Sequence, residues 1–434
     1  MVVINTNYVF VIAKRLEMLG GNNMAFISRE EAKEKINNII STQTPIKTGQ
    51  TLPIRSGTTF DVYLIPIDYL APNVLNDRIA WKIREWEAEN CRKLSPNNQN
   101  DVEYVYQLIE QESPKDNEKT LKDLADKGQQ VDGIITKDGI IIDGNRRATL
   151  LRKLFKGEAT RFHKNLEDFR FFKAIVLSED IDDKEIMALE TRIQIGEDKK
   201  LDYNPICIYI KVDNLSKADY NDQQIANYMN CSESDVKERK EIFKLMEEYL
   251  ESIGKPNHYT LLEGLEDQFI NTKTVFKRMD NGTYSTYDWD YTDDDVANFK
   301  QVCYDYLRSK FEGKKYRDIL IGKPNKTNGV FIKKDIWDAF YEHHEKIIEA
   351  NNPQNEKDWE LLGKKQFASN LKDASEKLEE TLKEKNVTAL VSAIQTKVRS
   401  LVECLNEKEE ISEDDLNILK GVSKDLWEII KDYK

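Results

Sequence analysis

The sequence predicts an α+β protein, in which a small mixed-sheet domain precedes a helical module and a mostly α-helical C-terminal region. Three observations indicate this class. Residues 130–155 alternate between apolar runs and turn residues and then change to helical spacing. Residues 220–250 contain two helical patterns joined by a short turn, and apolar residues recur at every third or fourth position between Leu390 and Ile430.

Composition limits the function classes. A chain of 434 residues is long enough for two to four domains. Its net charge of −13 argues against a general nucleic-acid coat and against binding to anionic membranes, although a local basic groove remains compatible with it. The five cysteines contain no C-x-x-C pair, which is typical of free thiols in a reducing cytoplasm. No apolar stretch approaches the ~20 residues that span a bilayer, so we expect a cytoplasmic protein without a membrane partner.

Residues 1–57 read as an N-terminal extension. Leu19-Gly20-Gly21 can be encoded by a bacterial ribosome-binding sequence at a suitable distance before Met24. We therefore hypothesise that Met24 is the natural start. Ser28 begins a capping-box pattern that predicts a helix to about Ile40, and the polar stretch that follows it, up to Thr59, predicts a link.

The stretch from Gln130 to Phe155 predicts a strand, a tight turn, a second strand and a helix. Asp138-Gly139 between two isoleucine runs is a strong hairpin signal. The second run ends at Asp143-Gly144, and a glycine there lets the backbone adopt conformations that other residues resist. Leucines at helical spacing then continue to Phe155.

Two arginines, Arg146 and Arg147, fall in the first turn of this predicted helix. The helix dipole is positive there, so cations are disfavoured unless an anion binds nearby. Unpaired backbone N–H groups and two guanidinium groups together form a typical phosphate site. The alternative is that both arginines pair with carboxylates on a solvated face.

The chain resembles the ParB/sulfiredoxin-like family, whose hallmark is a strand, a Gly-x-Arg-Arg box and a helix; here the box is Gly144 to Arg147. The resemblance covers about residues 58–250 and implies a nucleotide- or phosphate-binding domain at 58–180. Residues 82–128 are then a helical insertion, read as a lid, a partner surface or a tolerated surface elaboration. Three further segments match in order: Tyr63–Asp68 with Pro72-Asn73 and Arg78, then Glu190-Thr191-Arg192, then Leu201–Pro205.

The resemblance implies a site that holds CTP or ATP with Mg²⁺. The phosphates would contact Arg78, Gly144, Asn145, Arg146, Arg147 and Arg192, and Glu190 would help to hold the metal. The chain departs from the family pattern because Thr191 replaces an asparagine, Gln194 replaces the last arginine and Arg192 lies two residues early. The alternative for Glu190 is an ordinary carboxylate on a helix surface.

Three functions follow. The first is a DNA-associated protein in which a nucleotide regulates DNA binding or dimerisation, located in the cytoplasm and at the nucleoid if it binds DNA. The second is an NTPase or nuclease that uses Glu190 and Asp143, with Asp132 as a third metal-binding acid. The third is an interaction protein that has lost nucleotide binding.

Residues 181–255 predict a helix-turn-helix-like module. Asn230-Cys231 forms the turn, and Ser232 with Asp235 caps the second helix. Lys237, Arg239 and Lys240 are the candidate DNA contacts. Six acids oppose four bases between residues 232 and 248, so a helical module that packs without reading bases is the alternative.

Residues 256–434 predict a mostly helical C-terminal domain. Asp280–Asp295 is turn-rich and acidic and predicts a loop, and Ile336–Glu349 predicts a helix. Two further helices carry apolar stripes between Leu390 and Leu405 and after Ser412. Neither stripe is long enough for a convincing coiled coil, so we expect either a bundle packed on the core or a surface for a homodimer.

Overall fold

The computed structural model describes residues 26–55, 57–178, 181–196, 204–280, 289–316, 320, 322–323, 327–406 and 411–432. The chain forms two compact units, divided between Thr274 and Val275. The division falls inside helix α11 (Glu266–Asp280), whereas the sequence predicts a boundary before this helix, between residues 255 and 256. The hypothetical start at Met24 and residues 201–203 of the family-like segment lie outside the described residues.

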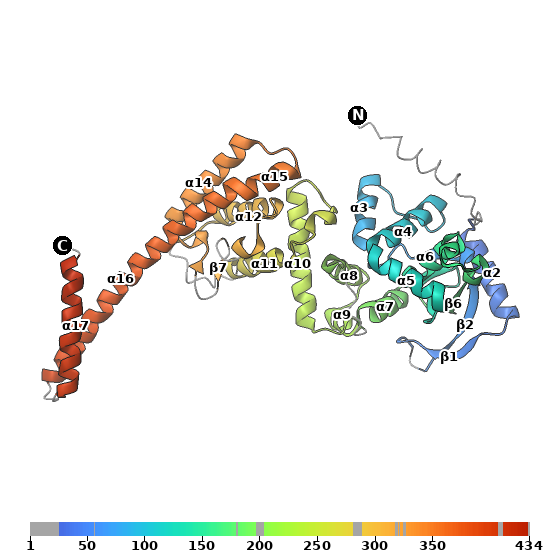
Figure 1. The fold of residues 1–434 in the computed structure, drawn as a ribbon, viewed down its shortest axis with the longest axis horizontal. Coiled ribbons are helices and arrows are strands. Elements are labelled where there is room, and N and C mark those ends of the chain that lie inside the picture. Colours follow the sequence, from blue (N-terminus) through green and yellow to red (C-terminus); the bar gives the residue numbers. More distant parts are fainter. Residues whose placement is uncertain are drawn as a thin grey trace. The chain divides into compact units, whose positions relative to one another are not determined.

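The first unit contains a six-stranded mixed sheet with the order β1-β2-β6-β4-β5-β3 (Figure 1). The central parallel pair is β4 with β6; β5 runs antiparallel to β4, and β2 runs antiparallel to β6. β3 pairs in parallel with β5 at one edge. The strands are β1 (Lys47–Thr51), β2 (Thr59–Pro66), β3 (Ala71–Pro72), β4 (Gly133–Ile135), β5 (Ile140–Asp143) and β6 (Phe171–Val176).

The edge strand β1 corrects the prediction that the residues before Thr59 form only a link. Its side chains are mostly exposed and polar, so no apolar alternation marks it. It is held by backbone pairing with β2, with an irregularity between Lys47 and Gln50. Such pairing depends on main-chain groups that every residue carries, and composition therefore does not reveal it.

Helices account for most of the rest of the first unit. They are α2 (Arg29–Thr42), α3 (Ala80–Asn90), α4 (Gln99–Glu112), α5 (Pro114–Lys127), α6 (Asn145–Phe155), α7 (Asp183–Thr191), α8 (Pro205–Lys217), α9 (Asp222–Met229), α10 (Glu233–Ser252) and α11. Ser28 caps α2, and Ser232 with Asp235 forms the capping box of α10, as predicted. The polar residues of the insertion predict a loop from Glu112 to Lys119 between two helical pieces. This prediction is wrong, because α5 begins at Pro114 and only Ser113 separates it from α4. Proline is well tolerated in the first turn of a helix, where its missing N–H costs nothing.

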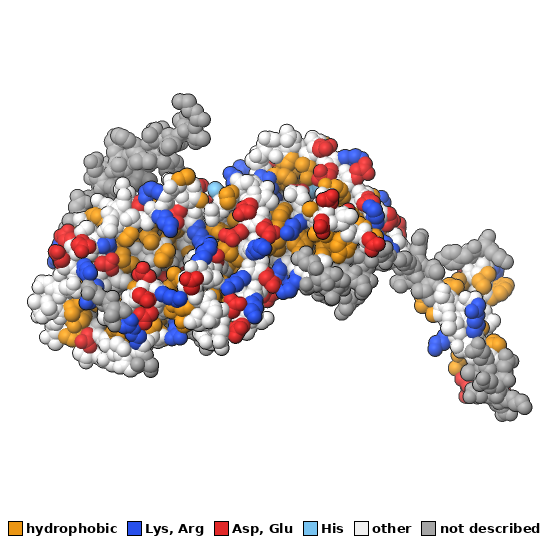
Figure 2. Space-filling view, turned by 180° about the vertical axis from the view of Figure 1, so that it is seen from behind, with side chains coloured by type: hydrophobic (Ala, Val, Ile, Leu, Met, Phe, Trp, Pro, Cys, Tyr) orange, Lys and Arg blue, Asp and Glu red, His pale blue; other side chains and the backbone are white. Residues whose placement is uncertain are grey.

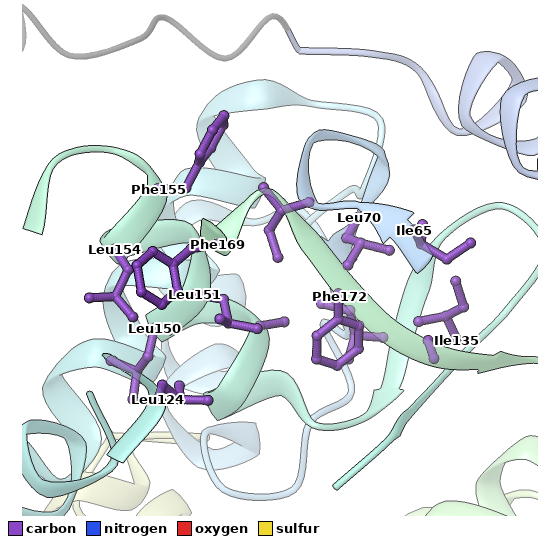
Figure 3. Packing of buried hydrophobic residues seen from close by; sticks show 14 of the residues in the cluster. Ile65, Leu70, Leu124, Ile135, Leu150, Leu151, Leu154, Phe155, Phe169 and Phe172 are labelled. Atoms are coloured by element: carbon purple, nitrogen blue, oxygen red, sulfur yellow. The ribbon is translucent and has the colours of Figure 1, made fainter. Parts of the chain in front are cut away.

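Two apolar cores cover the two faces of the sheet. Alternate residues of each strand face opposite sides, so Ile135 and Ile141 join one core while Ile134 and Ile142 join the other. The first core includes leucines of α6 together with Leu124, Phe169 and Phe172 (Figure 3). The second includes Leu189 of α7. The Gly144–Arg147 box is therefore fixed between a buried strand and a helix whose inner face is buried.

Helices α8, α9 and α10 share a third core. Asn230 ends α9 with a left-handed conformation (φ 49°), and α10 begins three residues later, at Glu233. Ile225 and Met229 of α9 pack with Val236 of α10 and Leu215 of α8. The predicted pair of helices joined by a tight turn is present.

The second unit is helical around an aromatic core. Phe299, Phe331 and Trp337 pack against one another in tilted and edge-to-face contacts, and Tyr306 packs on Phe340. Its helices include α12 (Asp293–Arg308), α14 (Lys334–Asn351), α15 (Glu356–Leu362), α16 (Ala368–Asn406) and α17 (Glu413–Asp432), and its two short strands are β7 (Gly322–Lys323) and β8 (Thr327–Asn328).

Helices α12 and α16 both begin earlier in the chain than the sequence predicts. Asp293 to Asp295 form the first turn of α12 rather than a loop, because Thr292 caps the helix and acidic residues are favourable there. Residues 281–288 of the predicted loop lie outside the described part of the chain. Helix α16 also begins well before the predicted stripe, since Leu371 and Leu378 bury its N-terminal part.

The described residues contain neither a membrane-spanning helix nor a disulfide bond. Among them, no helix is both long enough and apolar enough to cross a membrane. Cys91, Cys207, Cys231 and Cys303 are free thiols, whereas the side chain of Cys404 is outside the described part.

Candidate functional site

The junction of β5 and α6 requires the glycine at position 144. Gly144 has a φ of +93°, and a Cβ atom placed on it would lie 2.9 Å from Cζ of Phe172. A side chain is therefore excluded both by conformation and by space. Gly144 is also the residue that precedes the helix, and no side chain caps the first turn of α6. The first backbone N–H groups of α6 thus have no acceptor within the helix.

A cavity of about 490 Å³ lies at this N-terminus. It brings together most of the residues predicted for the phosphate site, although they come from separate parts of the chain. Those lining it are Arg78, Gly144, Asn145, Arg146 and Arg147, and Asp143, which was predicted as a catalytic acid, lines it as well. The insertion contributes Glu112 from the end of α4 to the same wall, and Gln194 lines it from the segment after α7.

Both arginines of the box are paired with carboxylates. Nη2 of Arg146 lies 2.9 Å from Oε2 of Glu112, and Nη2 of Arg147 lies 2.8 Å from Oδ2 of Asp143. Arg147 also donates a hydrogen bond to the carbonyl of Asp132, at 3.3 Å. The alternative interpretation was correct in proposing carboxylate partners, but the pairs line a cavity instead of a solvated face.

The side chain of Asn145 connects two segments of the chain. Its side chain is buried; Oδ1 accepts from the backbone N–H of Asn73 at 3.0 Å, and Nδ2 donates to the carbonyl of Ile141 at 2.9 Å. The amide thereby ties the Pro72-Asn73 segment to the start of α6. Its backbone N–H lies in the first turn of α6, where no acceptor is available within the helix.

Glu190 is buried, with 2 % of the residue exposed, so it is not the surface carboxylate that the alternative interpretation described. Its Oε2 lies 3.4 Å from Nζ of Lys211, which in turn lies 3.0 Å from Oδ2 of Asp77. Oε1 accepts hydrogen bonds from Asn73 and Gln194, each at 3.3 Å. Burial raises the pKa of Glu190 to about 8, although Lys211 lowers it in part.

This environment does not fit the predicted metal ligand. A carboxyl group with a raised pKa that already faces an ammonium group is a poor ligand for Mg²⁺, which prefers ionised, accessible oxygens. Asp143 lines the cavity and is the more suitable carboxylate. Among the described residues, Asp132, Asp143 and Glu190 are not a group of acids whose carboxylate oxygens all lie within 4.8 Å of one another, as the nuclease hypothesis would require.

Sequence reasoning missed Lys211 and Asp77. Lys211 lies in the apolar run from Ile206 to Val212, and a lysine inside such a run was a signal that it has buried partners. Asp77 carries no comparable signal.

Arg192 does not line the cavity. Its Nη1 donates to the carbonyl of Pro53, and its guanidinium lies 4.8 Å from the centre of the Tyr228 ring. Arg192 therefore joins the β1–β2 connection to α9, in keeping with its displacement by two residues from the family pattern.

The three candidate DNA contacts lie near the start of α10. Lys240 pairs with Asp222 at 2.6 Å, and Arg239 donates to Sγ of Cys231 at 3.5 Å. Lys237 is exposed and has no ion-pair partner among the residues that the structure describes. Basic and acidic side chains are interspersed over the described residues of the face drawn in Figure 2.

No protein-family model matches the sequence, and a search of curated proteins finds no relative.

Proposed function

We propose that the cavity at the start of α6 binds a nucleoside triphosphate, CTP or ATP, with its phosphates at the backbone N–H groups of residues 145–147. The observation that carries this proposal is the meeting of three arginines, Arg78, Arg146 and Arg147, at an uncapped helix N-terminus that lines a cavity. Positive dipole, unpaired amides and guanidinium groups are the elements of a phosphate site. The ParB/sulfiredoxin-like resemblance supports the same assignment.

Ligand binding would exchange partners at the arginines. A phosphate group can replace the carboxylates of Glu112 and Asp143, because guanidinium binds both kinds of anion through the same donors. Release of Glu112 would loosen the contact between α4 and α6. Of the three interpretations of residues 82–128, this exchange favours the lid.

A chain of polar contacts leads from the cavity toward the helical module. Gln194 lines the cavity and donates to Glu190, and Glu190 contacts Lys211 on α8. Helix α8 packs with α9 and α10. A nucleotide that moves Gln194 would therefore bias the position of α8, and this is the route by which we expect it to regulate DNA contact through Lys237, Arg239 and Lys240.

The C-terminal helices supply the proposed dimer surface. Val391, Ile394 and Val398 of α16 and Trp427 and Ile430 of α17 are exposed. Apolar side chains of this region are visible at the surface in Figure 2. Exposed apolar residues at helical spacing favour a protein contact over a solvated face.

A thermal-shift screen of the full chain with CTP, ATP, GTP and UTP, with and without Mg²⁺, tests the proposal. A ligand at a hundred times its dissociation constant stabilises the folded state by about 2.7 kcal/mol. We expect a selective shift that disappears in Arg146→Ala/Arg147→Ala but persists in Arg161→Ala. Arg161 is a matched control, because it forms an exposed ion pair with Glu118 outside the cavity lining.

A shift that survives the double substitution would place the nucleotide elsewhere. If no nucleotide shifts the wild type, alone or with duplex DNA, the interaction-protein hypothesis replaces this one. Duplex binding that falls steeply as salt rises would support phosphate contacts by α10.

A further inference from the structure

A histidine and two glutamates come together at a place remote in sequence from the arginine box. Glu85 and Glu89 lie one turn apart on α3, and His258 comes from the segment after α10, just before the 3₁₀ turn η5 (Tyr259–Leu262). One ligand atom from each of the three lies within 4.8 Å of the other two. Nε2 of His258 lies 3.7 Å from Oε1 of Glu89.

The orientation of the imidazole ring is set by the backbone. Nδ1 of His258 lies 2.9 Å from the carbonyl oxygen of Pro256. A carbonyl oxygen only accepts hydrogen bonds, so Nδ1 carries the hydrogen. In the neutral ring, Nε2 then directs its lone pair to the side where the carboxylate of Glu89 lies. Metal-binding histidines commonly donate their other N–H to a backbone carbonyl in this way.

The two carboxylates favour a cation at the same position. Like charges four residues apart on a helix repel each other. Among the described residues, neither Glu85 nor Glu89 has a lysine or arginine as an ion-pair partner.

Glu85 is already held in place. Its two carboxylate oxygens accept from Oγ1 of Thr260, each at 2.7 Å, and Oε2 also accepts from the backbone N–H of Thr260 at 3.3 Å. Helix α3 and the η5 turn are also joined by a hydrogen bond from Arg84 to Oη of Tyr259, at 3.3 Å. The three side chains thus lie on a preformed junction between α3 and residues 256–260.

We propose that Glu85, Glu89 and His258 bind a divalent transition-metal ion of the Zn²⁺ type. One imidazole nitrogen with two carboxylate oxygens is a donor set that suits Zn²⁺, whereas Mg²⁺ and Ca²⁺ take oxygen ligands alone. Three protein ligands leave one tetrahedral position for water, and Glu89, with 57 % of its side chain exposed, provides the access. The ion joins α3 of the insertion to the segment that follows α10.

Metal binding to the full-length chain tests this proposal. The protein is stripped with a chelator, equilibrated with Zn²⁺ or Mg²⁺ and measured by calorimetric titration and elemental analysis. We expect one Zn²⁺ per chain bound in preference to Mg²⁺, and a loss of affinity of at least about tenfold in His258→Gln and in Glu89→Gln. His163→Gln, outside this junction, should bind as the wild type does.

Thiol binding must be separated from this site, because Cys91 is exposed and lies two residues after Glu89. The titration is therefore repeated in Cys91→Ser, in which the affinity should be unchanged. Co²⁺ substituted at the site should show visible absorption bands that disappear in His258→Gln. Unchanged Zn²⁺ affinity in His258→Gln, or its loss in Cys91→Ser, would overturn the assignment; circular dichroism confirms that each variant is folded.

Discussion

Two ionic clusters in the first unit differ mainly in their access to water. The arginine pairs at the start of α6 are half-buried, with side chains 18 % and 25 % exposed for Arg146 and Arg147. Lys211, Asp77 and Glu190 are exposed by 2–3 %. A half-buried pair can exchange its carboxylate for a ligand anion at a small cost in free energy. A buried cluster that loses one member keeps an uncompensated charge. The first cluster is therefore better suited to the anion binding that we propose, and the second is better suited to holding the fold together.

The largest expected effect follows from removing the centre of the buried cluster. Lys211→Met leaves Asp77 and Glu190 facing each other without a cation. Breaking a buried ion pair on one side costs about 3–5 kcal/mol, so the free energy of unfolding should fall by that amount. Urea denaturation measures it.

Lys217→Met is the matched control, because Lys217 on the same helix is 65 % exposed and pairs with Asp213. We expect it to cost less than about 1 kcal/mol. Equal losses in the two variants would contradict the distinction between the clusters.

The pH dependence of stability sharpens the same distinction. Burial raises the pKa of Glu190 to about 8 and also raises that of Asp77. Between about pH 5 and pH 8 the folded chain therefore holds a proton that the unfolded chain has released, and this contribution to stability is lost as pH rises. Glu190→Gln removes the titration at that position. Relative to wild type, the variant should become steadily more stable from about pH 5.5 to 8.5, as measured by urea midpoints.

A difference between the two proteins that does not change with pH would show that Glu190 titrates normally. Lys211 does not contribute to this pH dependence, because its pKa is raised from an already high value and it stays charged throughout this range.

The arginine cluster should tolerate substitution better. Arg146→Ala/Arg147→Ala leaves the carboxylates of Glu112 and Asp143 unpaired, but both can still be reached by water. We expect a loss of roughly 1–2 kcal/mol in the free energy of unfolding, less than for Lys211→Met. The same urea experiment checks this. A loss as large as that of Lys211→Met would mean that the arginines are structural.

Local signals predicted the backbone of the candidate site, and long-range contacts determined its chemistry. The hairpin at Asp138-Gly139, the glycine at 144 and the helix after it all follow from neighbouring residues. The partners of Arg146 and Glu190 do not. Glu112 lies 34 residues before Arg146, in what the sequence indicated to be a loop.

The same reason explains other features that local signals did not predict. Asn145 and Arg192 were assigned by their place in a motif, but their side chains are engaged by Asn73 and by Pro53. Pairing in the edge strand β1 uses backbone groups and leaves no pattern in the side chains. Sequence reasoning could therefore place the arginines at the helix start without stating whether a carboxylate or a ligand faces them.

The smallest expected effect comes from a substitution that distinguishes Arg146 paired with a carboxylate from Arg146 paired with a ligand. Glu112→Gln keeps the shape of the side chain but removes the charge that competes with a phosphate, and it also lowers the negative potential of the cavity. Loss of one half-exposed ion pair should change the free energy of unfolding by less than about 1 kcal/mol. Nucleotide affinity should rise, by up to about fivefold for a 1 kcal/mol gain. Glu118→Gln, which removes the exposed partner of Arg161, is the control and should leave the affinity unchanged. Weaker nucleotide binding in Glu112→Gln would show that the carboxylate helps to hold the ligand, and the two clusters would then differ in burial but not in the role of their acids.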